Sequence, residues 1–111
     1  MTTALEKPAA NRPSASTKAD DRTRLFDALL ALKTRDEVEA FLTDLCTPAE
    51  VRAFAERWAV ARLLDQGGRS YREIACEAGA SPTTVVRVAR FLKEMPHQGY
   101  RLVLDRLHPK S

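Results

Sequence analysis

Apolar residues recur at intervals of three and four positions over most of this chain, which is the period of an α-helix. From Asp20 to Lys33, the leucines and Phe26 form a wide apolar face. Thr34 followed by Glu37 has the spacing of a capping box, so a second helix is expected to begin there and to include Leu45. The first half of the chain therefore predicts a pair of amphipathic helices.

A third, longer helix is predicted over residues 48–66. Thr47 and Glu50 repeat the capping-box spacing, and Gly67 and Gly68 end the helix. Its apolar residues spread around much of its circumference, so it needs neighbours on more than one side. One small monomer offers few neighbours, and we expect a second copy of the chain to supply the others in a homodimer. These apolar residues are Val51, Phe54, Ala55, Trp58, Val60, Ala61, Leu63 and Leu64.

Two shorter helices joined by a glycine-containing turn are predicted next. Ser70 and Glu73 again have capping-box spacing, which starts the first of the two. Gly79 stands where this helix must stop, because glycine adopts a positive φ at little steric cost. Ser81 as N-cap and Pro82 at the first helical position then predict the second helix. This succession of signals is a helix-turn-helix.

The second helix of this motif has two chemically different sides. One side is an apolar stripe, and the opposite side carries hydroxyl, guanidinium and carboxylate groups. Arginine can bond guanine through two hydrogen bonds, and threonine can bond a base edge or contact a thymine methyl. Helix-turn-helix proteins insert the amino-terminal part of such a helix into the major groove. The apolar stripe consists of Val85, Val88, Ala89 and Leu92, and the polar side of Thr83, Arg87, Arg90 and Glu94.

The expected partner is therefore double-stranded DNA. Residues 69–111, which contain the motif, carry eight basic and four acidic side chains, whereas residues 21–68 carry seven and nine. Positive charge near the motif favours phosphate binding, although it also suits a solvated surface. A homodimer would present two reading helices to half-sites about one helical turn apart. Base contacts are expected from Ser81, Pro82, Thr83, Thr84, Arg87 and Arg90, and phosphate contacts from Ser70 and Arg72.

The remaining features of the composition indicate how the chain is divided into segments and in which cellular compartment we expect it. Residues 1–19 are rich in Ala, Thr, Ser and Pro without apolar periodicity, which predicts a disordered N-terminal arm before a helical domain at residues 20–111. Cys46 and Cys76 are isolated in sequence and fall in apolar helical patterns, so packed free thiols are expected. No apolar run approaches the ~20 residues of a membrane span, and no signal peptide is recognisable. We therefore expect a cytoplasmic protein.

Two other function classes compete with DNA binding. An enzyme is disfavoured, because the histidines and cysteines lack zinc-like spacing and no phosphate loop or nucleophile motif occurs. No metal or cofactor is expected. The alternative is a helical protein-interaction module without DNA specificity, since helix-turn-helix units also serve as scaffolds. A protein-binding face would more often carry apolar anchors than the polar line at Thr83, Arg87 and Arg90.

Four stretches of the sequence together resemble the Trp repressor superfamily and, within it, the bacterial YerC/YecD branch of Trp-repressor-related proteins. The match runs in order over about residues 22–107. The resemblance implies an all-α fold of about six helices, an intertwined homodimer and a transcription regulator, in particular a repressor, that binds its operator through the helix-turn-helix. The stretches are Thr47-Pro48-Ala49-Glu50, Tyr71-Arg72-Glu73-Ile74-Ala75, Gly79-Ala80-Ser81 and Tyr100-Arg101-Leu102-Val103-Leu104-Asp105-Arg106-Leu107.

The resemblance also implies candidate effector residues, because the Trp repressor senses tryptophan. Thr47, Arg57 and Arg87 match the residue types that hold the amino acid there. Each has a second interpretation, namely an N-cap, a surface ion pair and a DNA contact, respectively. Val88 departs from the pattern, since it replaces a glycine that makes room beside the indole, and filling such a void is costly. An amino-acid co-repressor is therefore not the favoured expectation.

Overall fold

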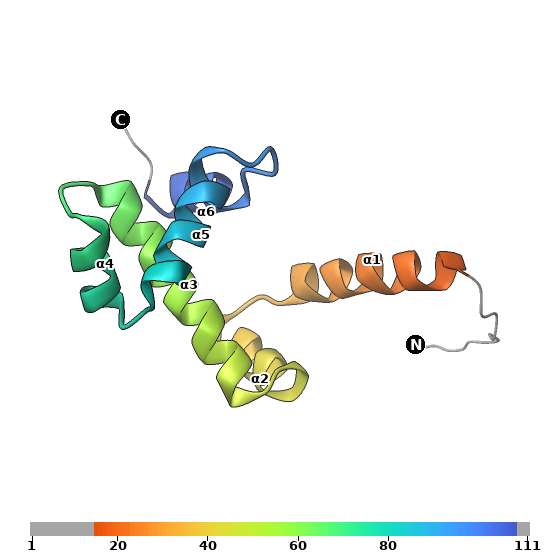
Figure 1. Ribbon diagram of the computed structural model, residues 1–111. Coiled ribbons are helices and arrows are strands. Elements are labelled where there is room, and N and C mark those ends of the chain that lie inside the picture. The colour runs from red at the N-terminus through yellow and green to blue at the C-terminus, as the bar shows by residue number, and fades with distance from the viewer. Residues whose placement is uncertain (1–14, 109–111) are drawn as a thin grey trace. The chain divides into compact units, whose positions relative to one another are not determined.

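The computed structural model describes residues 15–108, which form six α-helices in succession (Figure 1). No strand occurs in this part of the chain, and the predicted all-α fold of about six helices is confirmed. The chain divides into two compact units, Met1–Asp44 and Leu45–Ser111. The helices are α1 (Ala15–Ala31), α2 (Arg35–Leu45), α3 (Pro48–Gln66), α4 (Tyr71–Ala78), α5 (Pro82–Lys93) and α6 (Gly99–Leu107).

The first unit corrects one predicted boundary. Helix α1 begins at Ala15, five residues before the predicted start at Asp20. The added segment is Ala-Ser-Thr-Lys-Ala, which contains no proline or glycine to stop a helix from extending toward the N-terminus. The predicted disordered arm therefore does not reach residue 19, and residues 1–14 of that arm lie outside the described residues.

The start of α2 carries the predicted cap in a modified form. The Thr34 hydroxyl accepts a hydrogen bond from the Glu37 backbone amide at 3.1 Å. The Glu37 carboxylate accepts from the amide of Lys33 at 2.8 Å, one residue before the position that a reciprocal capping box uses. Thr34 is therefore an N-cap, and Glu37 binds the chain one residue further upstream.

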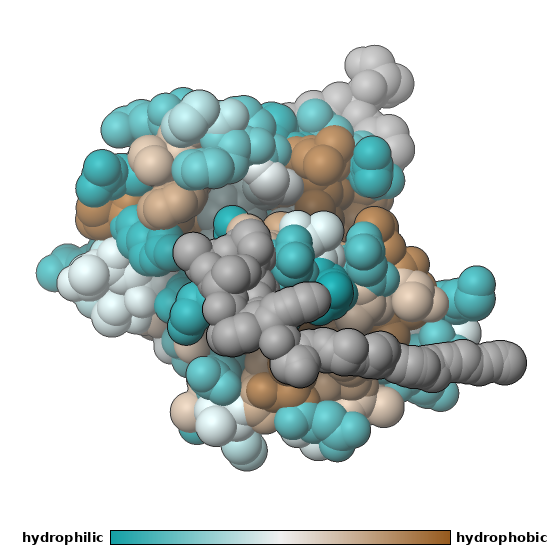
Figure 2. Space-filling view, turned by 90° about the vertical axis from the view of Figure 1, so that its right-hand side faces the viewer, coloured by the Kyte–Doolittle hydropathy of each residue, from teal (hydrophilic) through white to brown (hydrophobic). Residues whose placement is uncertain are grey.

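The apolar side chains of the first unit are largely exposed. None of residues 18–44 is buried, and Phe26 and Leu30 expose 48% and 82% of their surface. Figure 2 shows apolar side chains reaching the molecular surface among polar ones. The helices that the amphipathic pattern predicted are thus present, but their apolar faces have little to pack against within their own unit.

Helix α3 is the centre of the second unit, where it packs against α4, α5 and α6 (Figure 1). Its carboxyl-terminal half supplies buried residues, and one face each of α4 and α5 completes the core. The amino-terminal half departs from the prediction of broad burial, since Phe54 is 47% exposed. The core cluster consists of Val60, Ala61, Leu63, Ile74, Val85 and Val88.

Helix α6 is held against α3 by an ion pair and a ring contact. Nη2 of Arg101 lies 2.9 Å from a carboxylate oxygen of Asp65 on α3 and of Asp105 on α6. Hydrogen bonds to Asp105 and then to Asp65 raise the pKa of Arg101 above its ordinary value. The rings of Trp58 and Tyr100 stack with their centroids 6.4 Å apart.

Candidate nucleic-acid interface

Helix α4, its turn and α5 form the helix-turn-helix that the sequence predicts. Gly79 ends α4 in the left-handed conformation, with φ +65°. Its amide donates to the Cys76 carbonyl at 3.3 Å, and the Ala80 amide donates to the Ala75 carbonyl at 3.0 Å. These two bonds form a Schellman motif, which satisfies carbonyls that the end of α4 would leave without partners. The glycine thus sets the direction in which α5 leaves the turn.

The inward side of α5 is the predicted apolar stripe. Val85 and Val88 are fully buried, and Ala89 and Leu92 are 5% and 7% exposed. Val85 and Val88 belong to the same core cluster as Ile74 of α4. This packing fixes the rotation of α5 about its axis, because turning the helix would bring valines into water.

The opposite side of α5 faces solvent. Thr83, Arg87 and Arg90 are exposed, as the helical spacing predicts. The helix begins with Ser81, whose hydroxyl accepts from the Thr84 amide at 3.1 Å and lies 3.0 Å from the Thr84 hydroxyl. The exposed side of α5 thus presents one hydroxyl and two guanidinium groups from a helix with a rigid start.

Arg87 is held along the helix. Its guanidinium carbon lies 4.3 Å from the centre of the Phe91 ring, one turn further on, and the other ring partner of Phe91 is His97 at 6.3 Å. Such a cation–π contact restricts the guanidinium while leaving its N–H groups at the edges available to a ligand. Arg87 therefore adopts a defined direction before any partner binds.

The start of α4 forms a second polar edge. The Ser70 hydroxyl accepts from the Glu73 amide at 3.1 Å, and the Glu73 carboxylate accepts from the Ser70 amide at 2.8 Å, which confirms the predicted capping box. Arg72 is exposed in the first turn. The helix start at Ser70 and the cation at Arg72 are suited to an anion such as a backbone phosphate.

Two side chains at this surface are absent from the sequence-based expectations. Arg69 donates from Nε to Glu77 at 2.7 Å and from Nη1 to Gln66 at 3.1 Å, which connects the end of α3 to the end of α4. Its partners Gln66 and Glu77 lie on different helices, so no sequence pattern within one helix indicates them. Val86 is 50% exposed, and its place about 40° from Arg90 and about 60° from Thr83 on a helical projection of α5 could have indicated it.

The family model for the Trp repressor protein matches residues 21–108. A protein of Bacillus subtilis (strain 168) named YerC, itself uncharacterized, is 40% identical over 84 residues, which cover 76% of this chain and 79% of that protein. The chain belongs to the Trp repressor family.

Two crystal structures have the same fold as this Trp repressor family member. One is a candidate Trp repressor from Staphylococcus aureus, with 35% identity and a TM-score of 0.77, covering 89% of this chain and 99% of the other. The second is a TrpR-like protein from Eubacterium eligens ATCC 27750, with 36% identity and a TM-score of 0.77, covering 88% and 99%.

The candidate effector residues suggested by the Trp repressor resemblance make contacts with neighbouring residues of their own helix. Thr47 caps α3 in a full capping box with Glu50. The Arg57 guanidinium lies 5.9 Å from the centre of the Phe54 ring, a contact that neither of the two interpretations anticipates. Thr47 and Arg57 are about 15 Å apart along the helix axis, so one small ligand does not bridge them on a single chain. Val88 is fully buried, so its side chain occupies the core.

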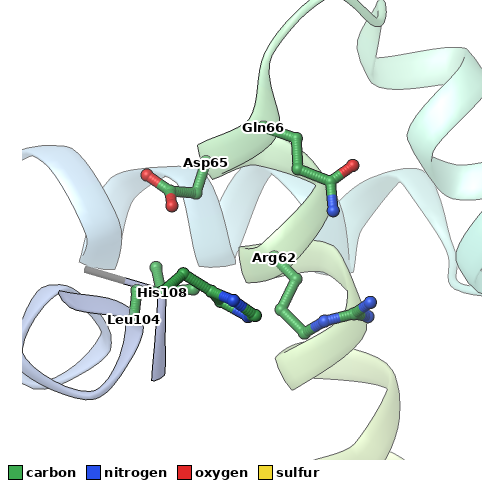
Figure 3. A pocket seen from close by; sticks show the side chains of 5 residues that line it. All are labelled: Arg62, Asp65, Gln66, Leu104 and His108. Carbon is green, nitrogen blue, oxygen red and sulfur yellow. The ribbon is translucent and has the colours of Figure 1, made fainter. Parts of the chain in front are cut away.

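A pocket of about 420 Å³ lies between the end of α3 and α6 (Figure 3). It has mixed charge, and Asp65 points away from Arg62 and Gln66 (Figure 3). None of its lining residues belongs to the helix-turn-helix helices, so it is not part of the exposed polar surface of α5. The lining residues are Arg62, Asp65, Gln66, Leu104 and His108.

The cysteines and histidines within residues 15–108 form no metal-binding centre. No three His, Cys, Asp or Glu side chains in that range are arranged to hold a metal ion. Cys46 is half-buried, but Cys76 is exposed on the outer side of α4, so the expectation of a packed thiol is wrong for Cys76. It follows the buried Ile74 by two positions, which turns it away from the core. Within residues 15–108, no helix combines the length and the hydropathy of a membrane span.

Proposed function

We propose that this chain is a sequence-specific DNA-binding transcriptional regulator, in particular a repressor, that inserts α5 into the major groove of double-stranded DNA. The observation that carries the proposal is the orientation of α5. Val85 and Val88 are sealed in the core, while Thr83 and Arg87 remain exposed. Membership of the Trp repressor family supports the same role.

Each exposed group has a chemical role in this proposal. Arg87 and Arg90 can each donate two hydrogen bonds to the O6 and N7 atoms of guanine, and Thr83 can bond a base edge. Ser81, Pro82 and Thr84 form the start of the helix that approaches the bases. Ser70 and Arg72, at the start of α4, contact phosphates and fix the position of α5 on the duplex. Binding chromosomal DNA implies an activity in the cytoplasm.

The active species in this proposal is a homodimer. The first unit supports it, because none of residues 18–44 is buried although α1 and α2 carry apolar faces. Short helices obtain most of their stability from packing such a face, so a partner surface is required. Exposed Phe54 in the amino-terminal half of α3 adds to this unpaired surface. A two-fold dimer would present two copies of α5 about one turn of DNA apart.

Selection of binding sites from random duplexes by the full-length chain tests the proposal. We expect a two-fold symmetric site that binds at least about a thousandfold more tightly than random DNA at physiological salt. Repeating the selection with each amino acid added tests for a co-repressor, and the buried Val88 leads us to expect no effect of tryptophan. Recovery of no common sequence, with equal binding to all duplexes, would contradict the proposed function and favour a protein-interaction module.

A further inference from the structure

Val86 interrupts the polar exposed side of α5. It is 50% exposed, and within α5 it is the one large apolar side chain with such exposure. It follows Thr83 by three residues and precedes Arg90 by four, so the three side chains are neighbours on the helix surface. At about 100° per residue, Val86 lies about 60° from Thr83 and about 40° from Arg90 around the helix axis.

The packing of α5 gives Val86 no part in the core of its own chain. Val85 and Val88 of the buried stripe are fully buried and lie about 100° and about 160° from Val86 around the helix axis. A single exposed apolar side chain is ordinary on a protein surface. The position of Val86 is not ordinary, because it is a neighbour on the helix surface of two side chains, Thr83 and Arg90, that are proposed to touch base edges. When α5 occupies the groove, this isopropyl group lies in the half of the helix surface that faces DNA.

The chemistry of the major groove then limits what Val86 can contact. Guanine, adenine and cytosine present hydrogen-bond donors or acceptors there, whereas thymine also presents its C5-methyl group. Covering a donor or acceptor with an isopropyl group removes its water without replacing the hydrogen bond, which is unfavourable. Covering a methyl group is favourable, because both partners lose apolar surface to water.

We infer that Val86 selects thymine at one fixed position of each DNA half-site by contacting its C5-methyl group. The inference rests on the proposed function. It names a specificity-determining residue whose contribution is steric and apolar, beside the hydrogen bonds of Thr83, Arg87 and Arg90. Pro82, exposed one turn earlier, extends the apolar surface in the direction of the helix start.

Deoxyuridine substitution isolates this methyl group, because it removes the C5-methyl and leaves the Watson–Crick pair unchanged. The test uses the full-length chain and the operator recovered by selection, with each thymine of a half-site replaced in turn. For one thymine, we expect the wild-type Kd to rise about fourfold per modified half-site. With Val86→Ala, the same replacement should change the Kd by less than about twofold, since the shorter side chain leaves the methyl uncovered.

Two further variants and a second modified base test whether the change in Kd comes from recognition of the methyl group by Val86. Val86→Thr keeps one methyl group and should keep part of the preference for thymine over deoxyuridine. Val103→Ala removes the same two methyl groups from a 44% exposed valine on α6 and should keep all of it. At the sensitive position, 5-methylcytosine should bind the wild-type chain more tightly than cytosine, and this gain should disappear with Val86→Ala. Circular dichroism verifies that each variant is folded.

The outcomes distinguish this inference from the proposed function. If selection recovers no common site, the proposed function fails and the thymine contact fails with it. If a site is recovered but no thymine shows a methyl effect that depends on Val86, the thymine inference alone is wrong. A methyl effect that is equal in wild type and Val86→Ala assigns the contact to another side chain and also overturns it.

Discussion

The two units of this chain contain the same kind of helix but differ in what the helices pack against. In Leu45–Ser111, buried residues from α3, α4, α5 and α6 form a core. In the first unit, α1 and α2 have comparable apolar residues, yet none of residues 18–44 is buried. Amphipathic pattern and capping therefore determine where a helix forms, whereas burial depends on the surface that is available to cover it.

This difference separates two requirements of the proposed regulator. The second unit holds the proposed reading surface on a core that one chain provides. The first unit has no buried residue among residues 18–44, and we propose that a second copy of the chain covers its apolar side chains. Substitutions in the second unit should therefore act at every protein concentration, and substitutions in the first unit should act through association.

Ile74→Ala should have the largest effect. Ile74 is 1% exposed in the core between α3, α4 and α5, so truncation leaves a cavity and should lower the free energy of unfolding by about 2–5 kcal/mol. Urea denaturation followed by circular dichroism measures it at several protein concentrations. Ala31→Gly, on the exposed end of α1, is a control expected to cost about 1 kcal/mol or less. Equal losses for both would remove the contrast between the two units.

Leu29→Asp should weaken the proposed dimer. Leu29 is 40% exposed on α1, and an unpaired carboxylate on a surface buried in the dimer is costly to desolvate. We expect the dimer dissociation constant to rise on the order of a hundredfold, or about 2.7 kcal/mol. Sedimentation over a range of protein concentrations measures this constant. Ala31→Asp introduces the same charge on the opposite side of α1 and should leave association nearly unchanged. A monomeric wild type at high concentration would refute the dimer.

The contrast between the units also explains which features were readable from sequence. Caps such as Ser70 and Gly79 are local signals, so the helix-turn-helix and the two sides of α5 were predicted with their boundaries. The exposure of Phe54 was not predicted, because α3 has the apolar pattern of a buried helix, and how much of it is buried depends on residues distant in the sequence. Arg69 was missed because its partners, Gln66 and Glu77, come together only after α4 folds back on α3.

Gly79→Ala should have a smaller effect that is confined to the turn. Gly79 has φ +65°, and an added Cβ would meet no atom within 4 Å, so the cost is that of the backbone conformation alone. We expect a loss of about 1–2 kcal/mol in the free energy of unfolding. Gly99→Ala is the matched control, because that position has equal space and no positive φ, and it should be neutral or stabilising. Urea denaturation compares the two, and equal losses would remove the conformational explanation.

Arg72→Ala should have the smallest effect and should sharpen the comparison between the units in DNA binding. A lost phosphate contact weakens binding to all sequences alike and lowers the slope of log K against log salt by about 0.9 per contact, or about 1.8 for a two-fold dimer. Arg22→Ala removes an arginine of the first unit that packs over Phe26 at 5.4 Å, and it should leave this slope unchanged.

Thr83→Ala should also leave the slope unchanged but reduce the preference for the selected site. Fluorescence anisotropy at several salt concentrations, on selected and random duplexes, measures both quantities. Equal slopes for Arg72→Ala and Arg22→Ala would show that the start of α4 does not contact phosphate, even if α5 reads the bases.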